Sequence, residues 1–521
     1  MSASAYRQMK PARALFALGG LLGLLGLLGV SGLSGCTSLP TAPASRVALT
    51  PQFQSAHSQA QPVDAQWWHR FNDPLLDAWV ERAVVNNSDV QMASARLRAA
   101  QAGVQANRSR LMPTVALNGS QSVSRSDLPD AVKRAGQPDI DASRLSLGLD
   151  WQLDVFGANR AGVAAAAHQA DAASAGIAGA RLLVVSQVVR QYVLWQSYQA
   201  RLAVLDQLLS SQQQTQRLVQ RREAEGLGSA FELRQIEADL AQTQAQFGPL
   251  RSAIQIAEYQ LALLAGENPS STNLALVVKP IDQWPTVVDL PVGQPADLLR
   301  RRPDIVAAEQ QLAAANASLA QAQAQRYPQF FANAVWGEQR LALNGLQLAT
   351  SPYSSMALAF SQPLLNRGAI KANITASTAR EQEALLNYEN TIRTAIMQVE
   401  SSLSAQTGEL ARSQQLQQTI HARQDAVRHA NSLYREGQTG LLPVLDLQRG
   451  VQAAELSYID SRSQQLLNLV QIYQALGGGW ENTSRSVTPS VESTDPVISA
   501  NPNPSLNATT TALTSAQGTQ P

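Results

Sequence analysis

The sequence contains one cysteine, Cys36, and few aromatic residues, which make up 5% of its 521 residues. A single cysteine excludes a disulfide framework within the chain. Neither sign of charge is in excess, because 40 basic residues stand against 39 acidic ones, so no nucleic-acid partner is expected. The apolar fraction is largely alanine and leucine, which favours closely packed helices over a thick globular core.

The sequence also lacks any familiar arrangement of catalytic residues. No phosphate-binding glycine loop and no nucleophile elbow occurs in the sequence. The five histidines are scattered without the spacing of metal ligands: His57, His69, His168, His421 and His429. We therefore expect neither an enzyme nor a metal or other cofactor site.

The longest apolar run lies at the N-terminus. Three basic residues precede an apolar stretch at 14–30, which is the order of a signal peptide. Leu33-Ser34-Gly35-Cys36 follows and resembles the bacterial lipobox, in which the cysteine becomes the new N-terminus and carries lipid. We expect a lipoprotein signal peptide over 1–35 and a lipidated tether over 36–70, with an uncleaved membrane anchor as the alternative. Thr37, in place of an inner-membrane retention aspartate, favours sorting to the outer membrane.

The remainder of the chain is a duplication. The second copy begins 215 residues after the first, and both copies run from an Ala/Gln-rich helical stretch through a proline to two strand-like segments. A repeat of this length is too long for a solenoid and indicates a doubled half-molecule. The matching pairs are Asp89 and Asp304, Ala93 and Ala308, Leu97 and Leu312, Ala99 and Ala314, Ala100 and Ala315, Ala102 and Ala317, and Pro113 and Pro328.

The strand-like segments alternate apolar and polar residues. The alternation is strict over 144–155, where about eleven residues suit a strand that crosses an outer membrane, although a half-buried sheet in a soluble domain has the same pattern. We expect one hairpin at about 113–155 and another at about 328–364. Four strands cannot close a spanning barrel, since the smallest have about eight. If these strands cross a membrane, several chains must therefore contribute strands to one barrel.

Each hairpin leads into a long proline-free run, at 157–225 and 364–436. A helix over the second run would be roughly 100 Å long. Small residues recur at three- and four-residue spacing, as in helices that pack closely in a coiled coil. Each run ends at a glycine, and an antiparallel partner is expected a few residues later: Gly226 is followed by Ser229, and Gly437 by Leu442.

These features divide the chain into segments. The first repeat spans 71–265, and the second spans 301–476. A proline-rich linker at 266–300 separates the two repeats. The tail over 477–521 is rich in Ser, Thr, Pro and Asn, so disorder is expected there.

Three motifs resemble the TolC-like outer membrane efflux proteins, in particular their lipoprotein branch. They are Leu299-Arg-Arg-Arg-Pro-Asp304-Ile-Val-Ala-Ala-Glu309, Leu263-Leu-Ala-Gly266 and Val444-Leu-Asp446, and the likeness extends over about 70–476. The resemblance implies a mainly helical homotrimer with membrane strands. Four strands from each chain would form a twelve-stranded β-barrel, continuous with a periplasmic α-helical barrel.

The resemblance also implies a function. Such a conduit lies in the outer membrane of a Gram-negative bacterium and contacts its lipid. It docks through a periplasmic adaptor protein on an inner-membrane pump, expected to be proton-driven, and exports drugs, toxic organics or metal ions. An exit channel for type I protein secretion has the same fold and stays open as an alternative. A periplasmic adaptor subunit and a coiled-coil lipoprotein are weaker alternatives, since neither explains two strand-bearing copies.

By the same resemblance, the last helices begin at a periplasmic constriction. Leu442 and Asp446 match positions that form apolar and acidic rings in the family, and Glu232 and Tyr434 match positions that link neighbouring hairpins. Three copies of Asp446 would make an acidic ring at the gate. The alternative for Asp446 is an ordinary favourable charge in the first turn of a helix.

Overall fold

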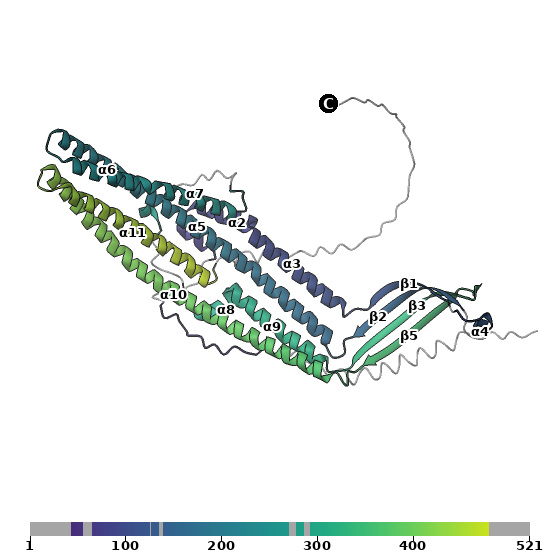
Figure 1. Cartoon of the computed structure of the whole chain (residues 1–521). Helices are drawn as coiled ribbons and strands as arrows, with labels where there is room; N and C mark the ends of the chain where they lie inside the picture. Colours follow the sequence, from purple (N-terminus) through teal and green to yellow (C-terminus); the bar gives the residue numbers. More distant parts are fainter. Residues whose placement is uncertain are drawn as a thin grey trace, which may run out of the picture. The chain divides into compact units, whose positions relative to one another are not determined.

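A computed structural model describes most of the chain (Figure 1). The described residues are 43–55, 65–125, 127–134, 139–269, 278–285 and 292–478. The expected signal peptide, the lipidation site at Cys36 and the tail beyond Gly478 lie outside these residues. The fold class is as predicted, because long helices combine with one sheet of four long strands.

The two predicted hairpins form a single antiparallel sheet. Strand β1 (Thr114–Ser124) pairs with β2 (Ile140–Leu153), and β2 pairs in turn with β3 (Gln329–Leu343). Strand β5 (Ser351–Ser361) and the short β4 (Leu346–Gln347) both pair with β3. Within the sheet, the two repeats are therefore joined by the β2–β3 ladder.

The register gathers the apolar side chains on one face of this sheet. Val115 lies opposite Leu149, which lies opposite Ala334, and Ala334 lies opposite Met356. Large apolar side chains on this face are solvent-exposed in the single chain: Val115, Leu117, Leu145, Leu147, Trp336, Met356, Leu358 and Phe360. The other face is more polar, and there the Asn333 amide donates a hydrogen bond to Asp150.

The helical stretch expected at the start of the first repeat is two helices, α2 (Pro74–Asn86) and α3 (Ser88–Ser109). They separate at Asn87, whose backbone is extended and whose side-chain oxygen accepts from the Asp89 N–H at 2.8 Å. Asparagine is a favoured N-cap because this bond satisfies one of the free donors of a new helix. A short helix, α4 (Asp130–Arg134), follows β1.

The two long helices match their predicted runs, as α5 (Ala158–Ala224) and α10 (Arg367–Arg435). Helix α11 (Leu441–Ala475) returns alongside α10 as one piece. The equivalent partner of α5 is broken into α6 (Ala230–Ala245) and α7 (Phe247–Leu264). The break coincides with Pro249 in the first turn of α7, because proline lacks the N–H that a continuous helix would use. This break was not predicted.

Short elements surround the middle of the helices. They are η1 (Trp67–Phe71), η2 (Ile281–Gln283), η3 (Pro295–Asp297) and α8 (Leu298–Arg301), and α8 leads into α9 (Pro303–Ala324). In Figure 1 the strands lie at one end of α5 and α10, and the turns that follow these helices lie at the other end. By length and composition α5 could cross a membrane, but the valines of its stretch at 184–193 are buried. They pack with Trp67, Leu76 and Tyr473 in a large apolar cluster, which we call the main core.

The N-terminal segment 43–55 is tied to α10 through its backbone. The Arg46 N–H donates to Glu389 at 2.9 Å, and the N–H groups of Gln54 and Ser55 donate to Glu400 at 2.7 and 2.9 Å. Phe53 is buried in the main core. The segment expected as a tether is therefore packed against the helices over these residues.

An equivalent hydrogen bond, which we call the joint, holds the last helix of each repeat. In the first copy the Asn87 amide donates to the Leu264 carbonyl at 2.9 Å, and in the second the Arg302 guanidinium donates to the Ala475 carbonyl at 2.8 Å. Asn87 and Arg302 are 215 residues apart, so equivalent positions bind the last turns of equivalent helices. Carbonyls at a helix end have no partner within the helix, and each joint supplies one.

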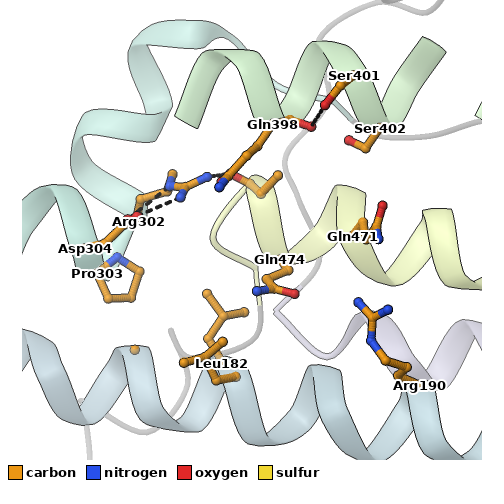
Figure 2. Close-up of a pocket in the computed structure, with 13 residues that line it drawn as sticks. Leu182, Arg190, Arg302, Pro303, Asp304, Gln398, Ser401, Ser402, Gln471 and Gln474 are labelled. Carbon is orange, nitrogen blue, oxygen red and sulfur yellow. Dashed lines mark hydrogen bonds and ion pairs between the residues drawn. The ribbon is translucent and has the colours of Figure 1, made fainter. Parts of the chain in front are cut away.

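A glycine lies beside each joint. Gly266 and Gly477 have φ of +73° and +71°, and an added Cβ would lie 2.6 Å from the Asn86 carbonyl oxygen and 2.8 Å from that of Arg301, respectively. Only glycine permits both this backbone and this approach. Figure 2 shows the second joint, where Arg302 also pairs with Asp304 at 2.7 Å beside a cavity of about 490 Å³.

We predict that Arg302→Ala lowers the free energy of unfolding by about 1–3 kcal/mol, because a buried carbonyl loses its donor. Asn87→Ala should have an effect of similar size. The thermal midpoint of helix loss, followed by circular dichroism of the purified chain, measures both. Arg300→Ala is the control, since that side chain is exposed on α8, two residues before Arg302. Equal midpoints for Arg302→Ala and Arg300→Ala would contradict the joint.

Candidate functional site

The predicted gate residues lie where the two helical hairpins turn. After α5 the chain closes through Gly226 (φ +74°), with the Leu227 N–H donating to the Arg222 carbonyl at 2.8 Å. After α10 it closes in the same way through Gly437 (φ +73°). Glycine at these positions ends each helix with a left-handed residue. Both glycines are therefore helix stops, as their spacing in the sequence predicted.

The two turns share one small apolar core, which we call the tip core. It draws on α5, α6, α10 and α11, so the first and second hairpins are packed together near their ends. Its buried members are Val219, Ile236, Leu240, Ala430, Tyr434, Leu441, Val444 and Leu445. Separation of the hairpins would expose these side chains to water at a cost of about 25 cal/mol per Å² of apolar surface.

Glu232 connects the first hairpin to the second at two points. One carboxylate oxygen accepts from the Tyr434 hydroxyl at 3.4 Å, and the other accepts from the Leu441 N–H at 3.2 Å. Leu441 is the first residue of α11, and its N-cap, Gly440, has no side chain to offer. Glu232 thus caps α11 from a different hairpin, and a carboxylate at a helix N-terminus is also favoured by the helix dipole.

The Tyr434 side chain is almost completely buried, at 1% exposure. Burial, followed by the nearby Glu232 charge, raises the pKa of Tyr434 to about 12. A phenol with a raised pKa stabilises the folded state below its ordinary pKa of about 10 and loses that contribution only as the pH rises through 12. Tyr434 therefore remains a hydrogen-bond donor throughout the physiological range.

Arg222 provides a second bridge between the hairpins. Its guanidinium donates to the Tyr434 carbonyl, and its central carbon lies 4.7 Å from the centre of the Tyr434 ring. The arginine thus covers the ring while it binds the last turn of α10. Cation–π contacts of this kind contribute about 0.5–1 kcal/mol at exposed sites.

The other predicted gate pair lies one helical turn apart on α11. Leu442 is half exposed, and Asp446 pairs with Arg449 at 2.7 Å. The same guanidinium reaches Asp239 on α6, where the two carboxylate oxygens lie at 3.0 and 2.9 Å. Arg449 is therefore shared by two carboxylates, one from each hairpin, and it offsets the charge of Asp446 in the single chain.

The structure brings Glu232 and Tyr434 together, while it places Leu442 and Asp446 on an exposed surface of α11. Analysis of the sequence missed three partners: Arg222, Asp239 and Arg449. Asp239 and Arg449 are 210 residues apart, close to the offset between the copies, and that spacing was the one available signal. Within the described ranges, no three His, Cys, Asp or Glu side chains gather in a group that could hold a metal ion.

The chain matches the family described as "Outer membrane efflux protein" over residues 79–267 and 295–478. It is 32% identical over 429 residues to the pyoverdine export outer membrane protein OpmQ of Pseudomonas aeruginosa, with 80% of this chain and 88% of OpmQ covered. It is 28% identical over 433 residues to the toluene efflux pump outer membrane protein TtgC of Pseudomonas putida, with 82% and 88% covered.

Solved structures of channels share the fold. The outer-membrane channel OprN superposes with a TM-score of 0.78 at 27% identity, covering 85% of this chain and all of OprN (100%). The open state of the Neisseria gonorrhoeae MtrE outer membrane channel superposes with a TM-score of 0.75 at 26% identity, covering 85% of this chain and 99% of MtrE. The described arrangement of sheet, helices and tips is thus that of a family of outer membrane channels.

Proposed function

Because the chain belongs to the outer membrane efflux protein family, we propose that it is the passive trimeric conduit of a tripartite efflux system. The observation that carries this proposal is the sheet, with an exposed apolar face and four long strands in one chain. A periplasmic adaptor and a proton-driven inner-membrane pump would be its partners. The relatives named for pyoverdine and toluene favour small molecules over secreted proteins as cargo.

The strand edges argue for an oligomer, and the family resemblance sets the number of chains at three. Among the described residues, the outer edges of β1 and β5 have no strand partner. In lipid each unpaired backbone group costs several kcal/mol, so these edges must meet those of other copies. Twelve strands from three chains would form a closed barrel in which β1 of one copy pairs with β5 of the next.

We assign the gate to the tips of the hairpins. In a trimer, three copies of Leu442 and Asp446 would surround the axis, while Glu232, Tyr434 and Arg222 would hold each pair of hairpins in the closed arrangement. A single hydrogen bond contributes only about 0.5–1.5 kcal/mol to stability. A few such contacts per chain are weak enough for a docked adaptor and pump to offset.

Glu232→Ala combined with Asp446→Ala should raise conductance in planar bilayers and make cells permeable to vancomycin. The double substitution removes the carboxylate that caps α11 and the proposed acidic ring. Asp425→Ala is the matched control, because Asp425 is an exposed acid on α10 that pairs with Arg428 on its own helix. If the double variant assembles but conducts like the parent, these residues do not form the gate.

The two faces of β2 should tolerate charge differently. Leu149→Arg places a charge on the apolar face and should cost about 2–4 kcal/mol near the membrane midplane, so assembly should fall. Asp150→Arg, on the polar face, should assemble normally and change ion selectivity. Heat-resistant oligomer on gels and single-channel recording report the two effects. Equal tolerance at both positions would argue against a membrane strand.

The lipid on Cys36 is a separate proposal from the position of the cysteine. Cys36→Ser should abolish labelling by a radioactive fatty acid and leave an unprocessed precursor. Ser34→Ala keeps a small residue in the motif and should label normally. A Cys36→Ser chain that still incorporates label would refute the assignment.

A further inference from the structure

Two adjoining cavities lie along α5 and α11, between the tip core and the sheet. One, of about 300 Å³, is also bordered by α10, and the other, of about 390 Å³, is bordered by residues 278–282. Val204, Gln207 and Glu455 line both cavities, so the two meet at a single carboxylate. Sites for small organic molecules measure about 300–1,000 Å³.

The walls of the larger cavity are mainly apolar. Ala200, Ala203 and Val204 come from α5, Ile459 and Tyr458 from α11, and Ile281 from η2. Ala203 is exposed and Ile281 is partly exposed in the single chain. These side chains offer an apolar surface to the body of a ligand, while Glu455 contributes a carboxylate to the lining.

The cations that border these cavities are already occupied. The Lys279 ammonium lies 3.2 Å from Asp73 and donates to the Asn72 carbonyl at 2.9 Å, and Arg428 pairs with Asp425. Neither is therefore free to neutralise Glu455. The negative charge of Glu455, where the two cavities meet, is therefore not compensated by the cations that line them.

Glu455 itself accepts a hydrogen bond from the Gln424 amide at 3.0 Å, and no cationic side chain of the described chain pairs with it. Burial raises the pKa of Glu455, in line with a carboxylate that lacks a cation. Asp282 lines the same larger cavity and likewise has no ion pair within the described residues. A ligand with a positive charge would relieve the cost of this burial.

We infer that this groove, which we call the side-wall groove, binds a small lipophilic organic cation. The apolar body of the ligand would lie against Ala203, Val204 and Ile459, and its charge would lie beside Glu455. This site is separate from the gate and from the membrane strands. Binding there requires no transport, so the inference goes beyond the proposed conduit.

The test uses the full chain, assembled and held in amphipol, with ethidium as the probe and fluorescence anisotropy as the measurement. Glu455→Gln should weaken ethidium binding at least tenfold, and Glu455→Asp should restore much of it. Glu383→Gln is the matched control, because Glu383 is an exposed acid on α10 that lines neither cavity. It should bind ethidium like the parent.

Ala203→Trp fills the groove from an exposed position and should abolish specific ethidium binding without affecting assembly. Unchanged affinity in either Glu455→Gln or Ala203→Trp would overturn the inference. A maleimide that fails to label Ala203→Cys in the assembled protein would also overturn it, since a neighbouring copy would then cover the groove. Conductance and export measurements, which test the conduit, do not enter this result.

Discussion

The structure depends on one constraint: a strand edge that enters lipid must find a hydrogen-bond partner. Four long strands of 11 to 15 residues have an exposed apolar face, and within the described chain β1 and β5 each present an unpaired edge. Water could satisfy such edges, but hydrocarbon cannot. The sheet therefore makes sense in a membrane only when copies of the chain complete one another, and the helices that follow each hairpin are then brought together around the same axis.

The duplication shows which parts of this arrangement are physically required. Both copies end with a left-handed glycine against the last residue of an earlier helix, α2 or α8, and with a side-chain donor on a terminal carbonyl. The donor is an amide at Asn87 and a guanidinium at Arg302, so the role is shared although the residue type is not. A carbonyl oxygen at a helix end needs a hydrogen-bond donor, and any donor that reaches it will serve.

The sequence predicted the local features well. Strict alternation indicated the strands, glycines indicated the ends of α5 and α10, and absence of proline indicated their length. The division at Asn87 was not predicted, because the helical pattern continues across it. An asparagine by itself does not mark the start of a helix. The break between α6 and α7 was missed although Pro249 marks it.

Contacts between the hairpins could not be predicted from local pattern, because Glu232, Arg222 and Asp239 meet residues more than 200 positions away. Only the resemblance to a family pointed to Glu232 and Tyr434, and it said nothing of Arg449. Contacts between residues so far apart in the chain leave no periodic pattern in the sequence. These partners are therefore found only once the hairpins are packed. The pair Asp239 and Arg449 was the exception, since its spacing of 210 residues is close to the 215-residue offset between the copies.

The tip combines two kinds of contact with different consequences for opening. The tip core, with Tyr434 and Leu441 fully buried, is apolar and favours movement of the two hairpins of one chain as a unit. The polar contacts around it are exposed and individually weak, and Arg449 divides its charge between Asp239 and Asp446. Opening that broke only these polar contacts would cost little, whereas opening that separated the hairpins fully would also expose the apolar surface of the tip core. The polar contacts around the tip core are therefore the ones that a docked partner can rearrange most cheaply.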